Sequence, residues 1–407
     1  MKFDFKTMYN STIQRLQELD LLQYILYTWG IPGMQPGDNR SIHAIHTVSV
    51  LVMFANHLYT FVLYSHYLGL CSKFQCSKVV ISLIMWRLFA VANWYSVFVK
   101  RREVRELLAS SRNLDKRYKA KIDKNKLIVN VLMVGILAVL FYLLIMILVI
   151  LWNDPATASS RFDEMTFRAR KNTSQDSSSS QSDQVETPFT SHHSFKVAAT
   201  FLVTSTTLLV KALSVFLTVF YTTWCHSLSQ VLAQCGDRLE HHSDRERAVL
   251  QFLVDYDAIH DMCLLTESAL SMQVFWLSSS HFVMVFIQFS KILGFYTYSN
   301  SIFVENTVLA ALQCVSFFAV TYFASEVHKQ DKVLREIASD LGFRIRLSKG
   351  SRDFGDLLEQ FLQSKEVVIF SALGIFDFTK GFLLSSTGVL ISYNLLILQL
   401  DIPNVPY

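Results

Sequence analysis

Residues 127–152 have the sequence LIVNVLMVGILAVLFYLLIMILVILW, which contains no charged side chain. A helix of about 20 apolar residues crosses the ~30 Å hydrocarbon core of a bilayer, so this stretch is long enough to span it. Six further stretches are also long and mostly apolar, and they cover residues 43–70, 78–99, 195–224, 267–293, 302–325 and 378–400. The sequence therefore predicts an all-α membrane protein with seven transmembrane helices.

The composition excludes several classes of protein. Hydrophobic residues make up 51% of the chain and charged residues only 17%, whereas a soluble domain carries about 25% charged residues. This composition rules out a disordered chain, a secreted disulfide scaffold and a nucleic-acid-binding protein. The chain has only 13 glycines, and its six prolines all lie outside the apolar stretches. Because transporters with broken helices place Gly and Pro at membrane depth, this pattern disfavours a secondary transporter.

The distribution of Lys and Arg predicts the orientation in the membrane. Four alternate segments together hold 26 of these residues: 1–40, 100–126, 225–265 and 326–365. The other four hold only 5: 71–77, 153–194, 294–301 and 401–407. Basic loops stay in the cytoplasm, so we expect an inside amino terminus and an outside carboxyl terminus. This orientation is opposite to that of a G-protein-coupled receptor.

The second outer loop, residues 153–194, is rich in Ser, Thr, Asp and Gln, and we expect it to be disordered. It contains Asn172-Thr173-Ser174, which predicts a glycosylated Asn172 on the outer side. Cys71 and Cys76 share the first outer loop, where a local disulfide and two free thiols are both open interpretations.

The inner segments have helical spacing of their apolar residues. Within residues 1–40, these residues are Ile13, Leu16, Leu19, Leu22 and Leu26. The segments are either amphipathic helices on the inner leaflet or helices packed into a cytoplasmic bundle, and their length favours the bundle. We therefore expect a cytoplasmic amino-terminal helix over 1–40, the first six spans within 41–325, cytoplasmic anchor helices over 326–377, the last span over 378–400 and an extracellular tail over 401–407.

No catalytic pattern is present. The chain has no phosphate-binding loop, no HExxH and no GxSxG sequence. The pairs His192-His193 and His241-His242 lie in polar loops, where solvated histidines are far more common than metal ligands. We therefore expect no enzyme activity, no metal site and no cofactor.

Polar and aromatic residues in the outer halves of the spans form a candidate ligand-binding site. They are Trp86, Arg87, Tyr142, His281, Gln288, Lys291, Glu305, Asn306 and Gln313. Ionisable residues in spans are costly and point to function, and an aromatic cavity with a few polar groups suits a small amphipathic ligand. In the alternative interpretation, Arg87 or Lys291 pairs with Glu305 only to neutralise charge, or extends to the interface.

The last span carries a stripe of small and polar residues on one helical face: Ser385, Gly388, Ser392 and Gln399. Such a stripe serves either tight helix packing inside a monomer or a face towards water, as in a pore. The residues alone leave these two interpretations open.

The carboxyl-terminal sequence SYNLLILQL, residues 392–400, resembles the signature of insect gustatory receptors, which is Thr-Tyr, five mostly apolar residues and Gln-Phe. Residues 372–376, ALGIF, are similar to the Ala-x-Gly-x-Phe sequence before the last span of that family. Gly30-Ile31-Pro32 resembles its Gly-x-x-Pro region before the first span. The chain departs from the signature at Ser392, Asn394 and Leu400, and Leu400 is similar to the odorant co-receptor branch of the superfamily.

The resemblance implies a tetrameric ligand-gated non-selective cation channel that responds to a small-molecule tastant, a sugar or a bitter compound. It implies a plasma-membrane protein of chemosensory neurons whose partners are lipid, permeating cations and further copies of itself or of related subunits. The last span would line the pore with Ser392, Tyr393, Leu396, Gln399 and Leu400, followed by Asp401 at the outer mouth. Leu396 and Leu400 would form apolar rings that exclude ions by dewetting. The alternative is a seven-span G-protein-coupled or other signalling receptor.

Overall fold

The computed structural model describes residues 74–117, 193–241, 245–293, 300–347 and 352–400, with scattered helical positions between 51 and 65. Four predicted segments lie outside the described residues, apart from residues 193 and 194: 1–40, the span 127–152, the loop 153–194 and the tail 401–407. The same is true of Cys71, Tyr142, Asn172 and Asp401, and the span 43–70 is described only at its scattered helical positions.

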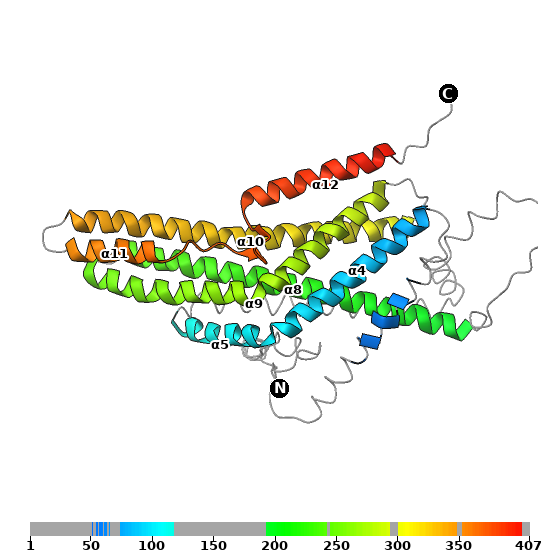
Figure 1. The fold of residues 1–407 in the computed structure, drawn as a ribbon, viewed down its shortest axis with the longest axis horizontal. Coiled ribbons are helices and arrows are strands. Elements are labelled where there is room, and N and C mark those ends of the chain that lie inside the picture. The colour runs from blue at the N-terminus through cyan, green and yellow to red at the C-terminus, as the bar shows by residue number, and fades with distance from the viewer. Residues whose placement is uncertain are drawn as a thin grey trace, which may run out of the picture. The chain divides into compact units, whose positions relative to one another are not determined.

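Helices dominate the described part of the chain (Figure 1). They are α4 (Phe74–Val99), α5 (Arg101–Arg117), α8 (His193–His241), α9 (Arg245–Leu293), α10 (Asn300–Arg346), α11 (Arg352–Ser364) and α12 (Lys380–Leu400). Two short strands, β1 (Ser371–Ala372) and β2 (Phe376–Asp377), lie between α11 and α12.

The chain divides into two compact units, which are described here by themselves. The first includes the described residues of 93–130 and 217–407, and therefore α5, α9, α10, α11, the two strands and α12. The second includes the described residues of 22–92 and 131–216, with most of α4 and the first half of α8.

Helices α8, α9 and α10 are far longer than a membrane is thick. They contain 49, 49 and 47 residues. At about 1.5 Å per residue each is longer than 70 Å, against a hydrocarbon core of ~30 Å. Predicted spans and predicted inner helices are therefore joined without a break. Within the described residues, Val249–Phe289 and Ala310–Arg346 are long and apolar enough to cross a membrane, and Ile84–Val99 is a shorter apolar helix.

The core of the first unit lies between these long helices. The indole Nε1 of Trp224 on α8 donates a hydrogen bond to Thr266 Oγ1 on α9, at 2.9 Å. Cys225 on α8 and Ile259 on α9 are fully buried in the same core. Helix α11 packs against α10, and α5 and α12 pack against α9. Arg344 and Arg346 lie in the last turn of α10, where their positive charges interact favourably with the negative end of the helix dipole.

Within the predicted anchor segment 326–377, residues 326–346 and 352–364 are helical, but the prediction of helix over residues 366–377 is wrong. Residues 366–370 form neither helix nor strand, and β1 and β2 then form an antiparallel hairpin in which Ser371 faces Asp377. Leu373 and Gly374 at its tip both have positive φ, 56° and 68°. A helix cannot pass through two left-handed residues, so the turn separates the anchor helices from α12.

Candidate functional site

A buried histidine links three helices of the first unit. His281 on α9 is fully buried, and its Nε2 lies 2.8 Å from Thr218 Oγ1 on α8. Its Nδ1 is hydrogen-bonded to Oε1 of Gln313 on α10. Because an amide oxygen only accepts, Nδ1 carries the proton and Nε2 accepts from the Thr218 hydroxyl. The ring is therefore held as the neutral Nδ1–H tautomer by two partners.

Two further polar side chains on α9 are buried and hold an oxygen that, among the described residues, has no hydrogen-bond partner. Gln288 and Ser278 are 3% and 1% exposed, and Gln288 Oε1 and Ser278 Oγ have no hydrogen-bond partner within the described residues. Gln288 follows His281 by seven residues, or about two turns, so both lie on the same side of α9. A buried acceptor without a donor costs roughly 1–3 kcal/mol, so a ligand that donates to Gln288 would recover that free energy.

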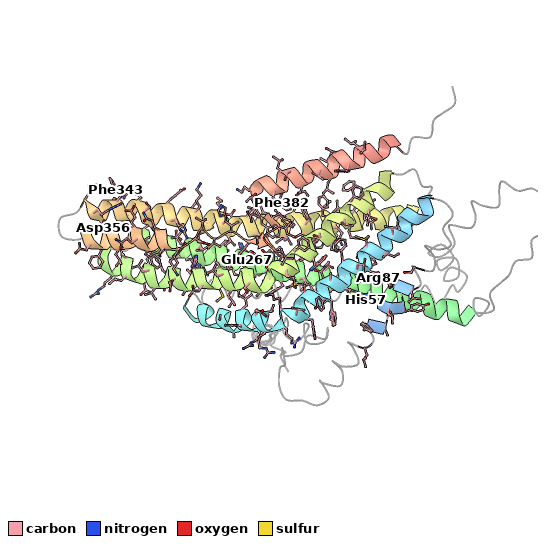
Figure 2. All side chains as sticks on the ribbon, in the orientation of Figure 1. His57, Arg87, Glu267, Phe343, Asp356 and Phe382 are labelled. Atoms are coloured by element: carbon pink, nitrogen blue, oxygen red, sulfur yellow. The ribbon has the colours of Figure 1, made fainter. Side chains whose placement is uncertain are left out.

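Aromatic side chains lead from this polar cluster towards α12. The Phe282 ring, next to His281, lies 5.9 Å from the ring of Phe317 on α10. Phe317 in turn lies 6.3 Å from Phe382 in the first turn of α12. Phe382 also stacks on Phe376 of β2, with centroids 4.5 Å apart and planes 5° from parallel. The hairpin thus packs on α9, and the start of α12 on α9 and α10, the helices of His281 and Gln313. Figure 2 labels Phe382 at the start of α12.

The remaining predicted ligand residues are not brought into this cluster by the described structure. Trp86 and Arg87 belong to the second unit, where both are buried and the Arg87 Cζ lies 4.9 Å from the centroid of the Trp86 ring. Lys291 lies near the end of α9, and Glu305 and Asn306 near the start of α10, with side chains outside those described. Among the nine predicted ligand residues, the described contacts join His281 to Gln313 and, separately, Arg87 to Trp86.

Helix α12 exposes its small and polar stripe. Ser385, Gly388 and Ser392 are all exposed, and a Cβ added to Gly388 would meet no atom within 4 Å. The interpretation that this stripe provides tight packing inside a monomer is therefore wrong for these three positions. Tyr393 and Leu396 are also 56% and 48% exposed. Gln399 and Leu400 lie in the last turn of α12, with side chains outside those described.

A carboxylate holds the hairpin against α9. Glu267 Oε2 accepts a hydrogen bond from Ser371 N at 3.1 Å, and Oε1 accepts one from Ser371 Oγ at 2.5 Å. Sequence analysis missed this residue, although Glu267 opens the apolar stretch 267–293 and an ionisable residue at that place is a usable signal. It also missed Thr218 and Ser278, because single hydroxyl residues are common in spans and carry no signal.

The described residues contain no group of three or more His, Cys, Asp or Glu side chains that could hold a metal ion. Cys225, Cys235, Cys263 and Cys314 are free thiols. Burial, together with the nearby Asp255 carboxylate, raises the pKa of Cys235 to about 12. Such a thiol stays protonated near neutral pH and is a poor metal ligand or nucleophile.

The backbone was compared with solved structures. It matches the structure of the insect olfactory receptor OR5 from Machilis hrabei over 98% of this chain and 100% of that chain, with a TM-score of 0.66 and 14% sequence identity. The chain has the fold of an insect olfactory receptor. The same receptor in complex with eugenol matches over 96% of this chain and 98% of that chain, with a TM-score of 0.62 and 15% identity.

This fold agrees with the one implied by the resemblance of residues 372–376 and 392–400 to insect gustatory receptors. No protein-family model and no curated protein sequence matches the chain. At 14% identity the fold is shared while nearly all side chains differ, so the ligand of OR5 does not transfer to this chain.

Proposed function

We propose that the chain is one subunit of a tetrameric ligand-gated non-selective cation channel, a gustatory receptor for a sugar or bitter compound in the plasma membrane of chemosensory neurons. The observation that carries the proposal is the full-length match to an olfactory receptor, which includes the last helix and the hairpin before it. The carboxyl-terminal motif adds the gustatory assignment.

The exposed stripe on α12 supports a shared pore. A Cβ at Gly388 would meet no atom within 4 Å, Ser385 and Ser392 are exposed, and a lipid-facing surface would have no need of these two serines. Four copies placed around one axis would turn this stripe towards water and towards each other. The subunits are either copies of this chain or related chains.

The ligand would bind between α9 and α10 beside the His281 cluster. The groups there are neutral, and Gln288 Oε1 is an acceptor without a donor among the described residues. This arrangement favours a neutral compound with hydroxyl or N–H groups over an anion or a cation. For Trp86, Arg87, Tyr142, Lys291, Glu305 and Asn306, a role in ligand binding stays a prediction, and they are not used to place this ligand.

Membrane orientation is tested by epitope tags. The proposal places a tag after Tyr407 outside the cell, where antibody stains intact cells, and a tag before Met1 inside, where staining requires permeabilised cells. Removal of a glycan-dependent gel shift by Asn172→Gln is expected on the same basis. Staining in the opposite pattern would reject the channel topology altogether.

Channel function is tested with the purified chain in a planar bilayer. The probe panel is sucrose, fructose, quinine and eugenol, each added from the side of the outer mouth. Single-channel cation currents that require one of these compounds are expected. If a panel compound binds the folded protein, as measured by calorimetry, and no compound evokes current, the chain is a receptor without a pore.

A further inference from the structure

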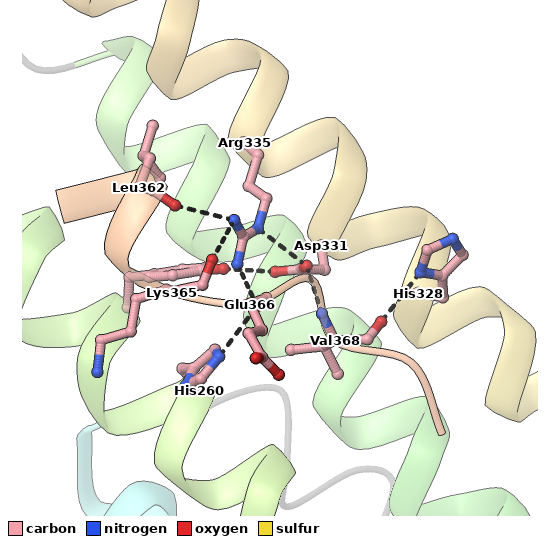
Figure 3. A network of polar contacts seen from close by, with 9 residues as sticks. His260, His328, Asp331, Arg335, Leu362, Lys365, Glu366 and Val368 are labelled. Atoms are coloured by element: carbon pink, nitrogen blue, oxygen red, sulfur yellow. Dashed lines mark hydrogen bonds and ion pairs between the residues drawn. The ribbon is translucent and has the colours of Figure 1, made fainter. Parts of the chain in front are cut away.

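Residues 365–370, which we call the linker, join α11 to the hairpin. Residues 366–370 form no helix or strand. Backbone N–H and C=O groups need partners where they are buried, so such a segment is held only where side chains supply them. Side chains from α9 and α10 converge on the linker and do so (Figure 3).

Asp331 on α10 binds the linker through a fully buried carboxylate. Its Oδ2 accepts hydrogen bonds from Val368 N at 3.0 Å and from Arg335 Nε at 3.1 Å. Its Oδ1 accepts one from the hydroxyl of Tyr256 on α9, at 2.7 Å. Three donors from two helices and the linker therefore meet at one carboxylate, which satisfies a charge that is very costly to bury unpaired.

Arg335 binds the other side of the linker. Its guanidinium donates to the carbonyl oxygens of Leu362 at 3.1 Å and Lys365 at 2.9 Å, and also to that of Glu366. The carbonyls at the end of α11 have no partner inside the helix, so Arg335 caps it. Arginine presents five N–H groups in a rigid fork, and lysine cannot reproduce these contacts.

Two histidines complete the contacts. His260 Nε2 on α9 lies 3.1 Å from Glu366 O, and His328 Nδ1 on α10 lies 3.0 Å from Val368 O. A carbonyl oxygen only accepts, so each ring donates an N–H to the linker. The linker is thus hydrogen-bonded to α9 and to α10 independently.

The same two helices also meet at the contact between His281 and Gln313. On α9, the 21 residues from His260 to His281 correspond to roughly 30 Å along the helix axis. The His281 contact joins α9 directly to α10. The His260 contact joins α9 to the linker, which is also hydrogen-bonded to Asp331 of α10. A shift of one helix along the other at the His281 level therefore changes the geometry at the linker.

We propose that Asp331 and Arg335 are positioning residues for gating: they fasten the linker to α9 and α10, so that a ligand-driven shift between these helices moves the start of α12. The inference rests on the proposed channel function. The pair also differs from its neighbours on the same helix. Arg344 binds Asp340 with the same four-residue spacing, but both side chains are exposed, at 68% and 58%, and within the described residues neither binds the linker.

The test compares Arg335→Gln and Arg335→Lys with the matched control Arg344→Gln in the full-length chain. Hydrogen exchange of the purified proteins is measured for the linker amides, of which Val368 is the most informative. Arg335→Gln is expected to exchange at least tenfold faster there than the wild type, and Arg344→Gln at the wild-type rate. Arg335→Lys keeps the charge beside Asp331 and is expected to lie between them.

The second readout is current, at matched surface expression, with the panel compound that evokes the largest wild-type response. Arg335→Gln is expected to lower the ratio of saturating to compound-free current at least tenfold, while the dissociation constant of the compound stays the same. A purely structural role would lower expression and leave this ratio unchanged in the molecules that reach the surface.

Each other outcome contradicts the inference in a distinct way. Unchanged linker exchange would show that Arg335 does not hold the linker, and faster exchange with an unchanged current ratio would show that the linker does not control gating. If Arg335→Gln does not fold, Arg335→Lys decides by the same two readouts. If the wild type passes no current with any panel compound, the channel function fails and the gating role with it, whatever the exchange data show.

Discussion

Gly355 lies on α11 in close contact with the backbone of α10, and its replacement by alanine should force the two helices apart. A Cβ at this position would lie 2.7 Å from Gly342 O and 2.5 Å from Arg346 Cγ. The arginine side chain can move, but the backbone oxygen cannot, and an ordinary contact starts at 3.4 Å. The helices must therefore separate by about 0.7 Å at this point, and such overpacking costs about 1–3 kcal/mol.

Gly342 provides the matched control on the opposite helix. A Cβ there would meet Gly355 O and Leu358 Cδ2 at 3.6 Å, which is ordinary contact. Alanine is favoured over glycine in a helix by about 0.8–1.0 kcal/mol, and this gain applies to both substitutions. Gly342→Ala should therefore stabilise by up to about 1 kcal/mol, whereas Gly355→Ala should destabilise by about 1 kcal/mol after the same gain is subtracted.

The assay heats the purified chain and then measures the fraction that remains folded by fluorescence-detected size-exclusion chromatography. For a chain of 407 residues, a difference of about 2 kcal/mol between the variants corresponds to a difference of about 2 °C in melting temperature. The expected order is Gly342→Ala, then wild type, then Gly355→Ala. A melting temperature for Gly355→Ala at or above that of the wild type would show that α10 and α11 are not in close contact at this glycine.

Four further predictions concern the ligand site, the gate, the outer mouth and one thiol. Gln288→Ala should raise the concentration of the active panel compound for half-maximal current about tenfold or more, because a hydrogen bond to a buried ligand contributes roughly 1–3 kcal/mol; an unchanged dose–response would remove Gln288 from the site. Leu400→Ala should give current without any added compound if it is a gate, whereas reduced expression with normal gating would make it a core residue. Asp401→Lys should lower cation conductance more at low salt than at high salt, because the effect is screened; equal loss at both would mean that Asp401 does not act through charge. Cys235 has a raised pKa, so its thiolate fraction at pH 7.5 is far below that of a free cysteine. Maleimide labelling of Cys235 should therefore be slow in the folded protein and fast after unfolding. Rapid labelling of the folded protein would contradict the burial of this thiol.

The sequence indicates several residues of the candidate site by their type, but it does not indicate which residues they contact. His281, Gln288 and Gln313 stand out because polar side chains are rare in apolar stretches, and all three are buried. Nothing in the sequence indicates that His281 binds Gln313, which is 32 residues away. Whether Arg87 or Lys291 pairs with Glu305 or lines a ligand pocket likewise depends on contacts that the spacing of residues in the sequence does not specify.

The linker shows the same limit more clearly. Asp331 and Arg335 are spaced like an ordinary exposed helix pair, and the sequence of Asp340 and Arg344 looks equivalent. In the first pair Asp331 is buried, Arg335 is 15% exposed, and the pair binds a segment up to 37 residues further along the chain, whereas the second pair faces solvent. The non-helical course of residues 366–377 was missed for this reason, since side chains from other helices supply its hydrogen bonds.

The sequence by itself determined the helical class, the lengths of the apolar stretches and the motif before and within α12. These properties follow from hydropathy and helical period, which add up locally along the chain. Only the tertiary structure decided that the stripe on α12 faces away from its own chain, and that Glu267 and Asp331 hold the segment leading into it. A buried polar group takes whatever partner the packing of distant helices brings within hydrogen-bonding distance, and that partner is not encoded in the residues beside it.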